Sequence, residues 1–150
     1  MAEQIHRPTG VANFKPAKSA RIKAKQRDTR EDRDGNSNAH LEAIRKCPCV
    51  VTLRIPAGEV HHLKQGTGER GAGMRSSDRW GVPLCRSAHD EIERIGSRNE
   101  TAWLQARGVP SPIDLAHALW KASPDVAAMT KIILAHRNSV IELKPDRATK

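Results

Sequence analysis

The sequence predicts an α+β fold in which a short β-ribbon is flanked by helices. Segments 59–63 (EVHHL) and 79–85 (RWGVPLC) have strand character, and segment 50–55 (VVTLRI) is rich in β-branched residues. A long loop with four glycines, residues 64–78, separates the two later segments. From residue 86 onward, apolar residues recur near helical spacing. These observations place the strands before most of the helices.

Capping and turn residues bound the first elements. Ser37 or Asn38 is a candidate N-cap for a short helix over residues 39–46. Pro83 indicates that the strand over residues 79–85 lies at a sheet edge, because proline cannot donate to a strand ladder.

The C-terminal third is predicted to be helical. A helix begins at residue 86, and a second over residues 99–108 closes at its final glycine. The Ser-Pro pair at residues 111–112 is typical of a helix start, with proline in the first helical position. The Ser-Pro pair at residues 123–124 repeats that signal and predicts the last helix.

Length and charge restrict the function classes. The chain has 150 residues, enough for one domain with tails. Its formal net charge of +9 favours polyanionic partners such as nucleic acid. Because it has no run of about 18 apolar residues and no apolar signal core at its start, we expect a cytoplasmic protein that does not bind membranes.

The domain organisation follows from composition. Residues 1–36 are predicted to form a disordered basic arm, with eight basic residues between positions 15 and 33. Such an arm can hold DNA by counterion release, or it can be a solvated tail that only aids solubility. Residues 37–137 form the expected folded domain, and residues 138–150 a flexible tail.

The His61–His62 pair is the first candidate for chemistry. It ends a predicted strand and precedes the glycine-rich loop. Neighbouring strand residues point to opposite sides, so one imidazole can face a metal while the other faces a substrate.

A second candidate pair lies on the helix that begins at residue 86. His89 and Glu93 are four residues apart and share one helix face, which suits two ligands on one cation. The alternative is an ordinary surface pair of histidine and glutamate.

The order of these groups carries a family resemblance. A His-His pair, a long loop, the tripeptide PLC and a histidine that opens a helix together resemble the HNH superfamily of ββα-metal nucleases. More closely, the stretch that contains RGAGMRSSD and VPLCRSAH is similar to the prophage-encoded HNH family that includes the recombination-enhancement nuclease. The resemblance covers roughly residues 40–122.

The resemblance implies a ββα-metal (HNH) core and a role for each candidate. His61 would be the first metal ligand, His62 the general base and His89 the second ligand. Glu93 falls where several relatives have another histidine ligand, and its carboxylate favours Mg²⁺ or Mn²⁺, with Zn²⁺ left open. Asp78 is the best stand-in for the middle asparagine of the HNH pattern, although its spacing does not match.

Four basic residues flank this set and are candidates for contacts to DNA phosphates: Lys64, Arg70, Arg75 and Arg86. Ordinary surface charge is the alternative for each of them.

The cysteines depart from the family pattern. Many relatives hold a structural zinc between two CxxC knuckles, whereas Cys49 and Cys85 each lack the second thiolate of their knuckle. Two thiolates alone cannot complete a tetrahedral zinc site, so we expect Cys49 and Cys85 to be neighbours in the core.

Together these features predict a divalent-metal-dependent DNA endonuclease of phage or prophage recombination, with DNA and a recombination protein such as a recombinase as partners. One alternative is an HNH-fold DNA-binding protein whose catalytic site has decayed. Another is an adaptor in which His61, His89 and Cys85 share a structural zinc.

Overall fold

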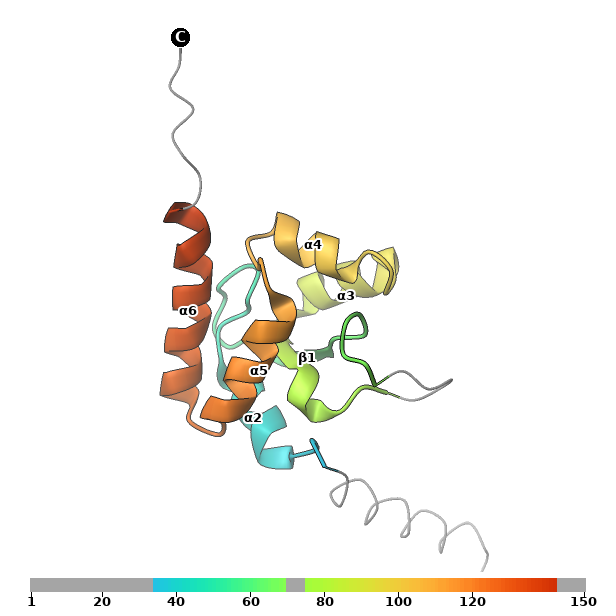
Figure 1. Ribbon diagram of the computed structural model, residues 1–150. Helices are drawn as coiled ribbons and strands as arrows, with labels where there is room; N and C mark the ends of the chain where they lie inside the picture. The colour runs from blue at the N-terminus through green and yellow to red at the C-terminus, as the bar shows by residue number, and fades with distance from the viewer. Residues whose placement is uncertain (1–33, 70–74, 143–150) are drawn as a thin grey trace, which may run out of the picture.

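The computed structural model describes residues 34–69 and 75–142 (Figure 1). The elements in chain order are helix α2 (Asn38–Lys46), strand β1 (Glu59–His62), the 3₁₀ helix η1 (Asp78–Trp80), strand β2 (Gly81–Leu84) and helices α3 (Arg86–Ile95), α4 (Glu100–Ala106), α5 (Pro112–Ala122) and α6 (Val126–Glu142). Helices and one antiparallel ribbon together make an α+β fold, as predicted. Across the described residues, no helix is long and apolar enough to cross a membrane.

The ribbon pairs β1 with β2 in antiparallel register, with His61 opposite Val82 and His62 opposite Gly81. A Cβ added at Gly81 would lie 2.9 Å from a side-chain carbon of Val60. Glycine is therefore needed where the strands meet. Pro83 lies in a two-stranded ribbon, so its missing N–H disrupts no third strand, and its predicted edge position is confirmed.

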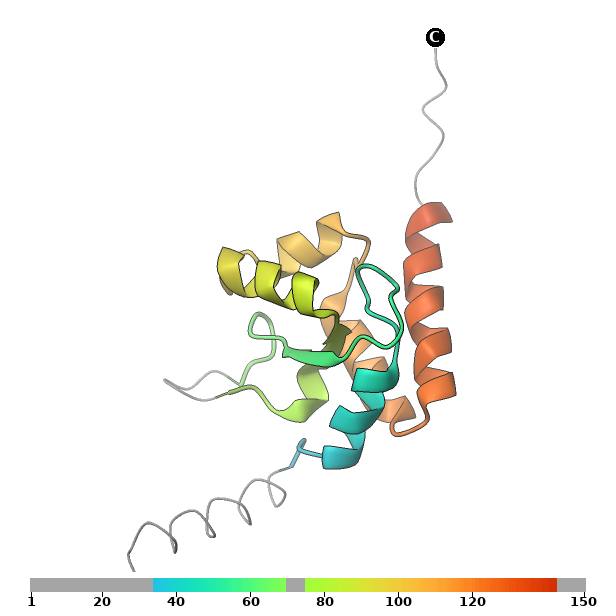
Figure 2. The same cartoon turned by 180° about the vertical axis from the view of Figure 1, so that it is seen from behind.

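The ribbon lies between two sets of helices. β1 contacts α2 on one side and α3 on the other, while α5 packs against β2 and α6 (Figures 1 and 2). The buried apolar side chains of the described residues form one core that extends from Ile44 of α2 through Leu84 of β2 to Ile133 of α6. Adjacent β1 residues therefore face two different helical surroundings.

The start of α2 confirms the predicted cap. The Ser37 hydroxyl accepts a hydrogen bond from the His40 backbone N–H, and the buried face of the helix includes His40, Leu41 and Ile44. The helix starts predicted near residues 86, 99 and 111 are likewise close to those of α3, α4 and α5.

The predicted strand over residues 50–55 is wrong. These residues form a turn in which the Leu53 N–H donates to the Cys49 carbonyl and the Cys49 N–H to the Arg54 carbonyl. Only Val50 reaches the ribbon, where its N–H donates to the Pro83 carbonyl. A strand at a sheet surface would alternate buried and exposed side chains, whereas residues 52–56 are all exposed. A β-branched composition was therefore not sufficient to predict a strand in this segment.

Two predicted boundaries also shift. Helix α6 begins at Val126, where Asp125 caps it by accepting the N–H groups of Ala127 and Ala128. The helix continues to Glu142, so the first five residues assigned to a flexible tail are helical.

At the other end of the domain, residues 34–36 were assigned to the arm, yet they contact η1. The Arg79 N–H donates to the Gly35 carbonyl and the Asp78 N–H to the Asn36 side chain. The rest of the predicted arm, residues 1–33, and of the predicted tail, residues 143–150, lies outside the described residues.

Candidate metal centre

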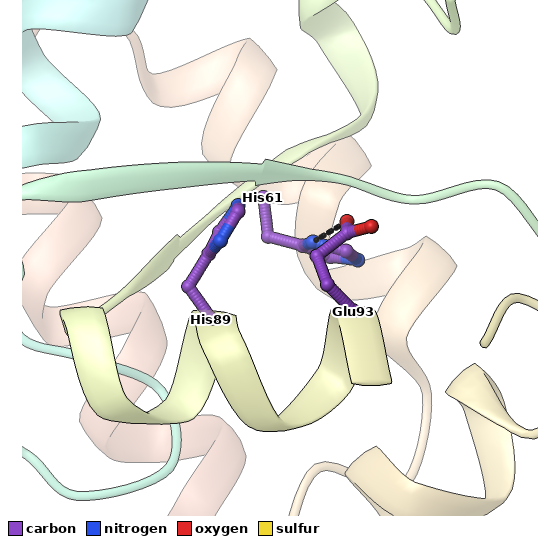
Figure 3. A group of neighbouring side chains, drawn as sticks. All are labelled: His61, His89 and Glu93. Atoms are coloured by element: carbon purple, nitrogen blue, oxygen red, sulfur yellow. Dashed lines mark ion pairs between the residues drawn. The ribbon is translucent and has the colours of Figure 1, made fainter. Parts of the chain in front are cut away.

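Three predicted ligands come together where β1 crosses α3 (Figure 3). His61 points from the strand toward the helix, and His89 and Glu93 point back from successive turns of α3. One nitrogen or oxygen atom from each of the three side chains lies within 4.8 Å of the others, and the two imidazole centroids are 5.4 Å apart. The predicted convergence of His61, His89 and Glu93 is confirmed. This cluster can hold a metal ion.

Glu100 of α4 controls the orientation of His61. The Glu100 Oε1 lies 2.8 Å from Nε2 of the buried His61, and its Oε2 accepts the backbone N–H groups of Lys64 and Gln65. Burial would raise the pKa of Glu100, but these hydrogen bonds outweigh it and hold the pKa below its ordinary value. An ionised Glu100 accepts the Nε2–H of His61, which leaves Nδ1, 3.4 Å from Glu93, as the nitrogen that a neutral ring would offer to a metal.

His89 also has a carboxylate behind it. Its Nδ1 lies 3.5 Å from the Glu59 Oε2, at the start of β1. Burial and the neighbouring His61 lower the pKa of His89, which favours the neutral imidazole that metal binding requires. Metal-ligating histidines commonly have their second nitrogen held by a carboxylate in this way. Both imidazoles of the cluster therefore have the surroundings of metal ligands.

The third ligand, Glu93, is paired with a lysine. The Lys64 Nζ lies 2.7 Å from each Glu93 carboxylate oxygen, and this hydrogen bonding holds the pKa of Glu93 below its ordinary value. Glu93 is thus ionised, and a metal ion would compete with the Lys64 ammonium for it.

His62 faces the opposite side of the ribbon, toward η1. Its Nε2 lies 3.0 Å from Asp78 Oδ1, and the Arg75 Nη2 lies 2.9 Å from its Nδ1. Burial is the main cause that lowers the pKa of His62, with Asp78 opposing it, so the imidazole is neutral near pH 7. With Asp78 accepting the Nε2–H, Nδ1 carries the lone pair that receives the Arg75 donor.

Asp78 is held from the start of the folded domain. Its Oδ2 accepts the backbone N–H of Ser37, and it is itself buried, with 3% of its surface exposed. The residue proposed as the stand-in for the middle asparagine therefore orients the imidazole of His62.

Three of the four predicted phosphate contacts, Lys64, Arg75 and Arg86, lie against other side chains in this structure. Lys64 holds Glu93, Arg75 contacts His62, and Arg86 bridges Glu59 and Asp90. Arg70 lies outside the described residues.

Cys49 and Cys85 lie in the core, apart from the cluster. The Thr52 hydroxyl lies 3.5 Å from the Cys85 sulfur, and the Thr52 N–H donates to the Cys49 sulfur. Burial would raise the pKa of Cys85, but hydrogen bonds, chiefly from Ser87 and Thr52, lower it to about 7. In the described parts of the chain, neither cysteine belongs to a group of three residues able to hold a metal, so Cys85 does not complete a zinc site with His61 and His89.

The roles of Glu59 and Glu100 were not predictable from the sequence. Both act through contacts between elements distant in the chain, and no spacing rule indicates such contacts. The only available signal was that acidic residues open the predicted helix over residues 99–108 and the strand over residues 59–63.

At a significant level, neither the curated proteins nor the solved structures contain a match to this chain. One family model matches residues 28–119, which is more than half of the sequence and includes every residue of the cluster and its carboxylate partners. The chain therefore belongs to the family described as "Protein of unknown function (DUF968)".

Proposed function

We propose that the chain is a divalent-metal-dependent DNA endonuclease with a ββα-metal core of the HNH type, formed by β1, β2 and α3. The observation that carries the proposal is the cluster of His61, His89 and Glu93. His62, the candidate base, follows His61 on β1. The chain order of these residues resembles that of HNH nucleases, and the net charge of +9 suits a DNA substrate.

The donor set fits a catalytic cation better than a structural one. Two imidazoles and one carboxylate supply three protein ligands, which leaves coordination positions for water and substrate. The carboxylate favours Mg²⁺ or Mn²⁺, and Zn²⁺ is the alternative. A cation held there would bind the scissile phosphate and stabilise the departing oxygen.

In the proposed reaction, His62 removes a proton from the attacking water. A neutral imidazole accepts a proton readily near pH 7, and the bond to Asp78 presents Nδ1 as the accepting atom. Arg75 contacts Nδ1 in this structure, so a DNA phosphate that attracts the guanidinium would free the lone pair for water.

The contacts made by Lys64 and Arg75 also favour a second candidate, a DNA-binding protein without nuclease activity. These two cations lie against Glu93 and His62, the groups that catalysis would use. Such a protein would bind DNA with steep salt dependence and yield no products with any divalent cation.

The test incubates the purified full-length chain with single-stranded, duplex and branched DNA, each with Mg²⁺, Mn²⁺, Zn²⁺ or EDTA. We expect cleavage with Mg²⁺ or Mn²⁺ that EDTA abolishes. His89→Ala should abolish it as well, whereas His117→Ala is the matched control, because His117 on α5 is not part of the cluster. Binding without cleavage by any cation would contradict the nuclease and support the second candidate.

A further inference from the structure

A pocket of about 290 Å³ lies on α2, close to His62. Its lining residues are Asn38, Leu41, Glu42, Arg45 and Arg75. The four from α2 recur at helical spacing, so they form one face of that helix, and Arg75 approaches from the segment before η1. The volume is close to the lower limit of about 300 Å³ for small-ligand sites, so the pocket suits one nucleotide unit rather than a long groove.

The two arginines make the pocket positively charged. In the described parts of the chain, Arg79, Arg86 and Arg107 each form an ion pair with a carboxylate, whereas Arg45 and Arg75 form none. A guanidinium matches the oxygen atoms of a phosphate by donating two parallel hydrogen bonds. Two such groups around one pocket, with Glu42 as the only acid among its described lining residues, favour an anionic ligand.

The pocket is tied to the candidate base through two contacts. The Arg75 Nη2 lies 2.9 Å from His62 Nδ1, and a guanidinium has further N–H groups besides Nη2. In addition, the Ser37 N–H at the cap of α2 donates to Asp78, the carboxylate that also holds His62. These contacts place the pocket beside the candidate base.

We propose that this pocket is a subsite for the backbone phosphate of a nucleotide next to the one that is cleaved, with Arg45 and Arg75 as its phosphate contacts. The inference rests on the proposed function, since it assigns part of that function's substrate to the pocket. Arg45 is the informative residue, because it lies in the pocket and makes no contact with His62 or with the metal cluster in the described residues.

The experiment measures DNA binding without cleavage. The full-length chain in EDTA is titrated against a labelled single-stranded oligonucleotide and its duplex at several KCl concentrations. Arg45→Gln should weaken binding by roughly tenfold and reduce the slope of log affinity against log salt by about 0.7–0.9. Glu42→Gln, which removes the acid from the same pocket, should strengthen binding. Arg54→Gln is the matched control, an exposed arginine that does not line the pocket.

The outcomes separate the subsite from the function. If the wild-type chain binds and cuts DNA while Arg45→Gln binds like the wild type, the subsite is refuted and the nuclease stands. An equal loss in Arg45→Gln and Arg54→Gln refutes the subsite too, because general charge then explains it. If the wild-type chain binds no DNA, the proposed function fails and the subsite fails with it. Circular dichroism melting confirms that each variant is folded.

Discussion

The carboxylate of Glu100 determines which nitrogen of His61 faces the other candidate ligands. It is 2% exposed and accepts two backbone N–H groups in addition to the His61 ring, so its own position is fixed. A buried carboxylate with three donors is stabilised in its ionised form. Because such a group sets the tautomer and basicity of a ligating imidazole, Glu100 is a positioning residue for the candidate metal centre.

Replacing this carboxylate should weaken metal binding without removing a ligand. For Glu100→Gln we expect Mn²⁺ affinity to fall by about 10–100-fold, measured by isothermal titration calorimetry. Asp114→Asn on α5 serves as the control and should bind Mn²⁺ like the wild type. Unchanged affinity in folded Glu100→Gln would show that His61 does not depend on Glu100.

The two adjacent histidines should separate metal binding from proton transfer. His62→Ala should slow DNA cleavage by about 10²–10⁴-fold while Mn²⁺ affinity stays near the wild-type value. His61→Ala should lose Mn²⁺ binding. Single-turnover cleavage and calorimetry on both variants give the two readouts. A His62→Ala chain that cuts DNA as fast as the wild type would refute its role as the base.

The sequence identified the candidate ligands but not the carboxylates that hold them. His61, His89 and Glu93 were predictable because strand alternation and helical spacing set their directions, and the resemblance set their order. Glu59 and Glu100 were not, since their contacts depend on how α4 and the start of β1 pack near the cluster.

At the scale of elements, helix α2 buries a histidine that the proposed mechanism does not use. His40 is 1% exposed, and its ring lies edge-on to Trp120 of α5, with centroids 4.8 Å apart. Burial lowers its pKa to about 4, although the charge of Asp78 opposes the shift and that of His62 adds to it. Between about pH 4 and its ordinary pKa of 6.5, the imidazole of His40 is therefore neutral in the folded chain but charged in the unfolded chain.

This burial predicts a loss of stability in acid. The unfolded chain protonates His40 below pH 6.5, whereas the folded chain does so only below about pH 4. The free energy of unfolding should therefore fall between these pH values, by about 3 kcal/mol from this group alone. His40→Gln should show a correspondingly smaller fall between pH 7 and pH 4 in urea unfolding. Equal pH dependence in both proteins would contradict the account.

Capping and proline signals in the sequence placed some elements correctly and one incorrectly. The cap at Ser37 and the Ser-Pro start at Ser111 fixed helix starts, and Pro83 lies in a ribbon as expected. Segment 50–55 failed because a β-branched composition was its only signal, and the start of α6 was misplaced because Asp125, rather than Ser123, caps the helix.

Across the whole molecule, Lys and Arg outnumber Asp and Glu, and many of these basic residues precede the folded domain. Eight Lys and Arg residues lie between positions 15 and 33, whereas residues 34–36 are bonded to η1 and belong with the domain. A basic segment adds to DNA affinity through counterion release whether or not it makes specific contacts.

Deleting residues 1–33 should therefore reduce both DNA affinity and its salt dependence. For every phosphate that the shortened chain no longer neutralises, the slope of log affinity against log salt should fall by about 0.7–0.9. Fluorescence anisotropy of full-length and shortened chains over a KCl series measures this, and equal melting temperatures show that the domain is intact. An unchanged slope would leave residues 1–33 as a solubility tail.

We expect His61, His89 and Glu93 to bind one divalent cation where β1 meets α3. Anomalous diffraction from crystals grown with Mn²⁺ tests it directly. One strong peak should lie about 2.0–2.3 Å from a nitrogen of each imidazole and an oxygen of Glu93, with Lys64 displaced from that carboxylate. A well-ordered cluster that shows no peak at saturating Mn²⁺, with Lys64 still bound to Glu93, would contradict it.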